Sequence, residues 1–331
     1  MGSTGFDPTF PTTIMAIHVH TQPLAIASIG SFYAGGKRVE VSGKPVRQLR
    51  LSHDLPHYPY DPNGTYSIDH AYVNFVIPAE PTGLPVVFVH GGGLTGSMWE
   101  TTPDGRPGWL TAFLRAGHPC YIVDNVERGR AGWCSLEGQW EGEPVLRTEA
   151  ESWTTYRIGT AEGYETRTPY AGSKFPVEYL AEASRQAVPR WVTNNFRAIA
   201  ALEAVIERVG RSVVISHSHG GGIASHVARN LPDLVAASVL LEPNGLPDVD
   251  TDVVPGPQVI VRGDFIDESP VFSELAERWD KYLQKSRAAH WPVEMVKLAD
   301  AGFRGSSHNM MMDSNSDDIA EFVTKWIERN S

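Results

Sequence analysis

The stretch Val213-Val214-Ile215-Ser216-His217-Ser218-His219-Gly220-Gly221-Gly222 decides how the rest of the chain is interpreted. Its β-branched start predicts a buried strand, and the glycines open a helix expected over residues 221–230. A serine at a sharp turn between a strand and a helix is the usual place of a catalytic nucleophile, because small flanking residues let the two elements approach each other. We therefore expect Ser218 to be a nucleophile, with Ser216 replacing the usual first glycine. The alternative is a Ser- and Gly-rich helix start without chemistry.

Buried strands alternate with helices on both sides of this turn. Strands are expected at residues 25–32, 68–77, 85–89, 120–123, 213–215, 235–241, 259–261 and 293–298, and helices at residues 109–116, 197–210, 221–230, 271–285 and 317–329. Continuous apolar runs such as PVVFV (85–89) are typical of strands that are buried on both faces. The pattern predicts an α/β fold with a mostly parallel, doubly wound sheet and an antiparallel edge formed by the early strands.

Residues 127–189 interrupt the alternation. They are rich in Gly, Glu, Thr, Trp and Tyr, and an insertion of this length is usually a lid over a site. We predict one domain over residues 1–331, whose core of about 25–126 and 190–331 bears this lid. Its aromatic residues either wall an apolar substrate pocket or form a small core of their own. They are Trp133, Trp140, Trp153, Tyr156, Tyr164 and Tyr170.

Composition excludes several classes of protein. The 331 residues include 28 Lys and Arg against 39 Asp and Glu, a net charge of −11, and no basic cluster favours a nucleic-acid partner. No apolar run approaches the roughly 18 residues of a membrane span, and no signal peptide is visible. We expect a cytoplasmic protein, although a trimmed N-terminus would leave secretion open. Two cysteines, Cys120 and Cys134, are too few for a disulfide scaffold, and the sequence does not tell whether they are bridged.

A glycine-rich turn, His90-Gly91-Gly92-Gly93-Leu94-Thr95-Gly96, follows the strand at residues 85–89. Glycines let the backbone approach the negatively charged oxygen that develops during acyl transfer. We expect an oxyanion hole formed by the N–H groups of His219 and of Gly92 or Gly93.

The same glycines fit the dinucleotide fingerprint Gly-x-Gly-x-x-Gly. That fingerprint must open a helix directly, and it needs an acid about twenty residues further on. Residues 99–108 break any such helix, and Asp124 lies too far along the chain. A non-catalytic dinucleotide-binding protein therefore stays a remote alternative.

His308 lies in a loop between the last strand and the final helix. A general base must reach the serine from the carboxyl end of the sheet, and His308 has that position. His217 and His219 flank the serine and should point away from it. His18 and His20 alternate without a third ligand, so no metal site is expected.

Two carboxylates follow strands and could orient His308. Glu242 lies in LLEPNG, and Asp264 lies in VRGD, one strand further on. The residues alone do not decide which of the two is the acid of the triad. The motifs HGGGLTG, SHSHGG, LLEPNG and GSSH resemble the α/β-hydrolase superfamily from about residue 25 to the C-terminus. Within it they resemble a small serine esterase branch with a Ser-Glu-His triad, whose glutamate follows the sixth strand. This resemblance implies Glu242 as the acid and Asp264 as its reserve. The branch can have two adjacent cysteines in the oxyanion loop, where this chain has Gly92 and Gly93.

Residues and resemblance together predict a carboxylesterase that works through an acyl-serine intermediate without a cofactor or a metal. The expected substrate is a small apolar ester, lactone or thioester. We expect neither a nucleic acid nor a membrane as a partner. A thioesterase, a lactonase or a lactone-forming acyltransferase would use the same triad. The fold is compatible with a homodimer.

Overall fold

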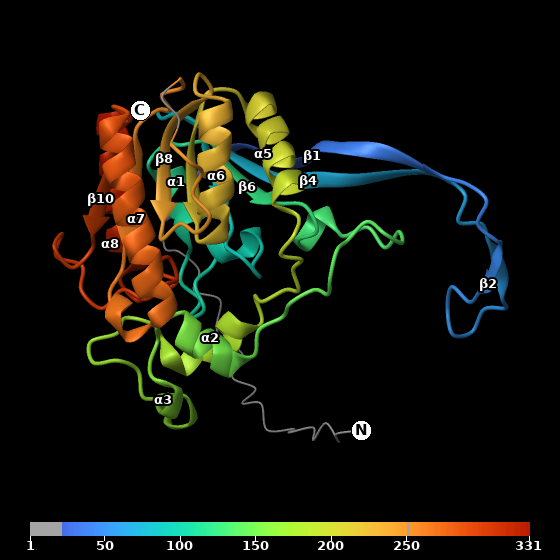
Figure 1. The fold of residues 1–331 in the computed structure, drawn as a ribbon, viewed down its shortest axis with the longest axis horizontal. Coiled ribbons are helices and arrows are strands. Elements are labelled where there is room, and N and C mark those ends of the chain that lie inside the picture. Colours follow the sequence, from blue (N-terminus) through green and yellow to red (C-terminus); the bar gives the residue numbers. More distant parts are fainter. Residues whose placement is uncertain (1–21, 250–251) are drawn as a thin grey trace.

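The computed structural model describes residues 22–249 and 252–331, so His18 and His20 lie outside the described residues. Eight strands form one sheet in the order β1-β4-β6-β5-β7-β8-β9-β10 (Figure 1). The strands from β6 to β10 in this order are parallel, and β4 and β1 join them antiparallel. The predicted fold class is confirmed. The strands are β1 (Ile26–Val41), β4 (Gly64–Pro78), β5 (Val86–Val89), β6 (Cys120–Asp124), β7 (Ser212–His217), β8 (Val235–Leu241), β9 (Gln258–Arg262) and β10 (Val293–Lys297).

Helices cover both faces of the sheet. One face carries α5 (Asn195–Val209), α6 (His219–Asn230) and α7 (Pro270–Ala288), and the other carries α1 (Trp109–Arg115) and α8 (Ser316–Asn330). Alternate residues of β5 point to opposite layers. Val86 and Phe88 belong to the cluster that includes α1 and α8, whereas Val87 and Val89 belong to the cluster with α5 and α6. Burial on both faces explains the uninterrupted apolar runs of these strands.

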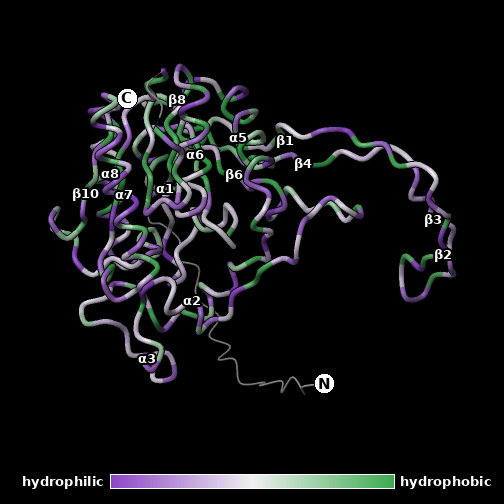
Figure 2. The backbone as a smooth tube through the Cα atoms, in the orientation of Figure 1, coloured by the Kyte–Doolittle hydropathy of each residue, from purple (hydrophilic) through white to green (hydrophobic). Residues whose placement is uncertain are grey.

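The first two strands of the sheet are longer than expected. They pair from Ile26 with Pro78 to Val41 with Gly64, and their outer halves leave the body as an arm (Figure 1). The strands β2 (Arg47–Leu49) and β3 (Tyr58–Tyr60) pair at its tip. Figure 2 shows apolar and polar stretches alternating along this arm. The sequence between the two expected strands, residues 33–67, contains many Pro, Tyr and His residues, and its pattern did not predict this arm.

The predicted lid, residues 127–189, consists of short helices joined by loops. These are η2 (Gly129–Ala131), α2 (Glu149–Thr155), α3 (Ala161–Thr166), η3 (Val177–Tyr179) and α4 (Leu180–Ser184). In Figure 1, α2 and α3 lie beyond the end of the sheet toward which β8 points. A backbone bridge between Val145 and Arg190 joins the two sides of the insertion. The lid therefore faces the edge where parallel strands place functional loops.

Composition left a disulfide between the two cysteines open and predicted no membrane span. Cys120 and Cys134 are both free, and burial raises the pKa of the Cys120 thiol. Across the described ranges, no helix is long and apolar enough to cross a bilayer.

Candidate active site

Ser218 occupies the sharp turn between β7 and α6. Its φ of 52° and ψ of −120° are a conformation that costs a non-glycine residue about 1–3 kcal/mol. A side chain on Gly220 would overlap the carbonyl oxygen of His90, and a Cβ on Gly221 would lie 2.6 Å from Cβ of Pro243. The glycines thus let α6 pack closely beneath the serine.

The loop that follows β8 anchors this turn. The N–H of Ser218 donates to the carbonyl of Leu241 over 2.9 Å, and the carbonyl of Ser218 accepts from the N–H of Asn244 over 2.9 Å. These two partners flank Glu242 in sequence. The backbone therefore holds the candidate nucleophile beside the candidate acid.

His308 makes a hydrogen bond with Glu242. The distance from its Nδ1 to Oε2 of Glu242 is 2.5 Å, and both side chains are buried. The N–H of His308 donates to the carbonyl of Tyr156 over 2.9 Å, and its own carbonyl lies 3.0 Å from Nε2 of His217. The imidazole lies between the rings of His217 at 4.4 Å, Phe272 at 4.6 Å and Tyr156 at 6.0 Å. Its orientation is therefore fixed from several sides.

A lid residue that the sequence did not single out completes this arrangement. Arg157 donates from Nη1 to Oε2 of Glu242 over 2.8 Å and from Nη2 to Oε1 over 2.5 Å. Its Nε donates to the carbonyl of Asp264 over 2.8 Å, and its guanidinium lies 4.1 Å from the centre of the Phe272 ring. The N–H of Gly263 also donates to Glu242, over 2.8 Å. The ion pair is completely shielded, because both side chains are 0% exposed.

These contacts determine the charges of the two groups. Burial alone would raise the pKa of Glu242, but the Arg157 charge and the His308 hydrogen bond outweigh it and bring this pKa to about 2. Burial lowers the pKa of His308 below its ordinary value, although Glu242 opposes the shift. At neutral pH the site therefore holds a charged carboxylate beside a neutral imidazole, which can accept a proton.

Asp264 has a different partner. Its carboxylate accepts a hydrogen bond from the N–H of Gly305, and its own N–H donates to the carbonyl of Ser306 over 2.8 Å. Asp264 thus shapes the loop that leads to His308, and Glu242 contacts the ring.

The predicted oxyanion residues adjoin each other. A Cβ on Gly92 would lie 3.3 Å from Cβ of His219. Gly93 has a φ of 74°, and its carbonyl accepts from the N–H of Val188 in the lid over 2.8 Å. Within the described part of the chain, no acceptor pairs with the N–H groups of Gly92, Gly93 or His219. These donors are available to a developing oxyanion.

The segment GGGLTG does not open an α-helix. It leads into a short 3-10 turn, η1 (Gly96–Trp99), and α1 begins only at Trp109. Asp124 accepts hydrogen bonds from the N–H of Gly96 and from Nε of Arg130, each over 2.7 Å. The acid that a dinucleotide fold would offer to a ribose is engaged within the protein.

A model described as Alpha/beta hydrolase family matches residues 86–294, which include Ser218 and Glu242. The chain belongs to the alpha/beta hydrolase family.

Two relatives narrow the type of hydrolase. The first is the probable secreted lipase phiG of Fungal sp. (strain ATCC 74256). It is 28% identical to this chain, and the match covers 80% of this chain and 88% of the lipase. The second is the solved structure of a novel bacterial esterase, with a TM-score of 0.82 and 29% identity over 94% of this chain and 98% of the esterase. The hydrolase is therefore of the esterase/lipase type.

The lid aromatics divide between different places in the hydrolase. Trp153 is fully buried in a lid core with Ile158, Phe175 and Leu180, and Tyr164 packs edge-on against it. Trp133 and Trp140 both pack against Trp191, and Tyr170 stacks on Phe265. Tyr156 lies beside the site, with its ring stacked on His308. Trp153 thus belongs to a lid core, one of the two roles left open by the sequence, and Tyr156 packs against that core as well as on His308; the pocket wall stays a prediction.

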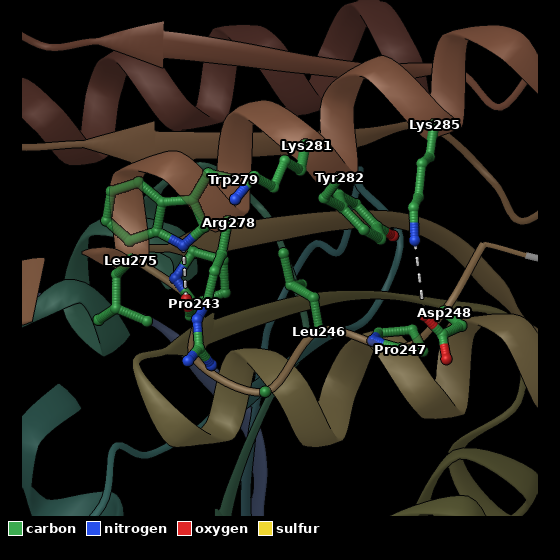
Figure 3. A pocket seen from close by; sticks show the side chains of 11 residues that line it. Pro243, Leu246, Pro247, Asp248, Leu275, Arg278, Trp279, Lys281, Tyr282 and Lys285 are labelled. Carbon is green, nitrogen blue, oxygen red and sulfur yellow. Dashed lines mark hydrogen bonds and ion pairs between the residues drawn. The ribbon is translucent and has the colours of Figure 1, made fainter. Parts of the chain in front are cut away.

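Two cavities border the site of the hydrolase. One of about 510 Å³ lies between the lid and the start of α7, and its lining includes Arg147, Thr154 and Phe272. Phe272 also contacts the imidazole of His308, but none of the predicted catalytic side chains lines this cavity. The other, of about 230 Å³, lies between α7 and the loop after Glu242, where Trp279 donates to the carbonyl of Pro243 (Figure 3). None of the predicted catalytic side chains lines that second cavity.

Proposed function

We propose that this hydrolase is a serine carboxylesterase with Ser218, His308 and Glu242 as its catalytic triad. The observation that carries the proposal is the hydrogen bond from His308 to Glu242 at the end of a sheet whose strained turn presents Ser218. The order serine, acid, histidine along the chain agrees with the family. Glu242 follows β8, which supports the Ser-Glu-His branch.

The first half of the reaction forms an acyl-enzyme. Oγ of Ser218 attacks the carbonyl carbon of the ester, and Nε2 of His308 takes the hydroxyl proton. Glu242 holds the ring by Nδ1 and stabilises the imidazolium that forms. The N–H groups of His219 and of Gly92 or Gly93 bind the oxyanion. His308 then returns the proton to the leaving alcohol as the ester bond breaks.

The second half releases the acid. Water attacks the acyl-serine while His308 again accepts a proton, and this proton returns to Oγ of Ser218 when the acyl–oxygen bond breaks. A thioester or a lactone would pass through the same acyl-serine, and an internal alcohol could replace water. The triad is therefore proposed for acyl transfer to water, with the carboxylic ester as its substrate.

The test combines covalent labelling with a substrate panel. An active-site phosphonate should label Ser218, identified by mass spectrometry of the tryptic peptide, and Ser218→Ala should lose both labelling and hydrolysis. Short- and long-chain esters, lactones and thioesters, assayed against Ser218→Ala as the blank, identify the preferred class. Binding of a nicotinamide dinucleotide without labelling of Ser218 would contradict the proposal.

The compartment is part of the same proposal. Two free thiols, Cys120 and Cys134, support a reducing compartment and hence the cytoplasm. The description of the fungal relative as secreted favours the medium instead. Immunodetection of the tagged natural chain in cells and in culture medium decides between them, and recovery from the medium alone would contradict a cytoplasmic location.

A further inference from the structure

Arg190, the first residue after the predicted lid, lies directly beside the predicted oxyanion hole. A Cβ on Gly92 would be 2.7 Å from Nη1 of Arg190 and 3.3 Å from Cβ of His219. The backbone of Arg190 is held on both sides, since it exchanges two hydrogen bonds with Val145, of 2.8 and 3.1 Å, and nearby Val188 donates to Gly93. Backbone contacts with Val145 in the predicted lid therefore hold Arg190 where its guanidinium lies beside Gly92.

The charge of Arg190 also acts on Tyr156, a residue that packs against His308. Burial raises the pKa of the Tyr156 hydroxyl, and the neighbouring charges of Arg147 and Arg190 act against that rise. The ring of Tyr156 stacks on His308. The geometry thus places Arg190 beside Gly92, and its charge acts on a residue that contacts His308.

Among the described residues, no carboxylate forms an ion pair with Arg190. Its side chain, which is half-buried, makes no hydrogen bond or ion pair with any residue in the ranges that the structure describes. Burial lowers the pKa of Arg190, and the guanidinium groups of Arg128 and Arg147 lower it further, whereas the charge of Glu127 acts in the opposite direction.

Neighbouring groups that could compensate this charge are already engaged or neutral. Glu127 pairs with Arg128 over 2.6 Å and accepts from the N–H of Trp191, and Glu151 pairs with Arg147 over 3.1 Å. Burial and the adjacent arginines lower the pKa of His219 to about 3, so its ring is neutral at pH 7. One uncompensated positive charge is left beside the reaction centre. Half-burial removes part of the water around this charge, and an anionic ligand that pairs with it would offset that cost.

We propose that Arg190 binds a carboxylate of the substrate, so that this hydrolase prefers esters that carry one negative charge near the scissile bond. A guanidinium is the side chain best suited to a carboxylate, which it grips through two parallel hydrogen bonds. One free charge matches a monoanion, whereas a phosphate dianion would need more donors. In a chain with a net charge of −11 the overall field repels an anion, so that its recognition needs a local cation.

The inference rests on the proposed esterase function, and matched esters separate the two. One pair differs on the acyl side: mono-p-nitrophenyl glutarate and p-nitrophenyl valerate. The other differs on the leaving group: 4-(carboxymethyl)phenyl acetate and 4-ethylphenyl acetate. In at least one pair, the wild-type protein should have a higher kcat/KM for the anionic ester than for its neutral partner. This difference should come from a lower KM for the anionic ester. The pair that responds tells which side of the ester carries the charge.

Arg190→Gln is the decisive variant. It should lower kcat/KM for the preferred anionic ester by about 10- to 100-fold and for its neutral partner by less than about 3-fold. Arg190→Lys should keep part of the preference. The matched control is Arg167→Gln, an exposed lid arginine 3.8 Å from Glu149, which should behave as wild type. Added salt should raise KM for the anionic ester in wild type, and much less in Arg190→Gln.

Other outcomes are equally informative. An equal loss on both esters of a pair in Arg190→Gln would assign Arg190 to the oxyanion and overturn the inference, as would a wild type without preference for either anionic ester. In both cases hydrolysis that depends on Ser218 would leave the esterase function intact. Failure of all four esters, together with no phosphonate labelling, would overturn the function and the inference together.

Discussion

Oε2 of Glu242 lies 2.5 Å from Nδ1 of His308, whereas the carboxylate of Asp264 accepts from the N–H of Gly305. Both acids end neighbouring strands of the sheet, and only the first contacts the imidazole. The acid of this hydrolase therefore comes from β8 rather than β9 in the proposed triad.

Replacement of Glu242 and of Asp264 by the corresponding amide should lower kcat to different extents. Glu242→Gln removes the charge that stabilises the imidazolium and should lower kcat by up to about 10⁴-fold. Asp264→Asn keeps an oxygen that can accept from Gly305, and we expect less than a 10-fold loss. Steady-state kinetics with active sites titrated by phosphonate measures both. If Asp264→Asn is the crippled variant, the proposed triad is wrong.

Loss of Arg157 should destabilise the fold. Arg157→Gln leaves the fully buried carboxylate of Glu242 without its cation, and removal of one partner from a buried pair costs about 3–5 kcal/mol. Urea unfolding measures this difference. The control Arg167→Gln removes an exposed lid arginine near Glu149, and such surface pairs contribute at most about 1 kcal/mol. Equal, small effects in both variants would show that the buried pair does not hold the lid to the body.

The pH profile should report His308. The imidazole must be neutral to take the proton of Ser218, so kcat/KM falls as pH drops through its pKa. Burial places this pKa below the ordinary 6.5, and the midpoint of the acid limb is therefore expected below pH 6.5. Hydrolysis of a neutral ester across the acid range gives the midpoint. A midpoint above 6.5 would mean that Glu242 outweighs burial.

Asp313 should make stability depend on pH. This buried carboxylate accepts two hydrogen bonds from Ser307, each of 2.7 Å, next to His308 in sequence. Burial raises its pKa from 3.8 to about 7, although Ser307 opposes the rise. Between these values the folded protein holds a proton that the unfolded chain has lost, so the stability due to this group falls as pH rises.

Asp313→Asn, which resembles the protonated acid, tests this dependence. Its free energy of unfolding relative to wild type should increase between about pH 4 and pH 7, by no more than about 1.4 kcal/mol per pH unit. Denaturant titrations at several pH values measure this difference, and Asp280→Asn on the exposed side of α7 serves as the control. A constant difference across that range would show that Asp313 titrates normally.

Local patterns predicted the body of the hydrolase well, because its strands are buried on both faces and its helices are amphipathic. The Ser218 turn and the Gly-rich loop were equally visible, since each depends on small residues at fixed spacing. The choice between Glu242 and Asp264 was different, because both end buried strands. The resemblance favoured Glu242, and the structure places it against His308.

Features that depend on long-range contacts were not predictable in the same way. Arg157 has a φ of 54° and pairs with a residue 85 positions away, and nothing in the lid sequence marks it. Arg190 resembles any polar residue at the end of a loop until the fold brings it to Gly92. The arm formed by β1 and β4 was underestimated, because its outer residues have no core to impose an alternation of burial.

The predicted lid holds the proposed base and the acid that orients it, Glu242 through Arg157 and the His308 backbone through the carbonyl of Tyr156. A lid that swung away would strand an ionised carboxylate in the interior and release the base from its orientation. The arrangement of Glu242 and His308 that the proposed reaction needs therefore includes Tyr156 and Arg157 in their present positions. Substrate preference can then change through the rest of the lid while these two positions stay as they are.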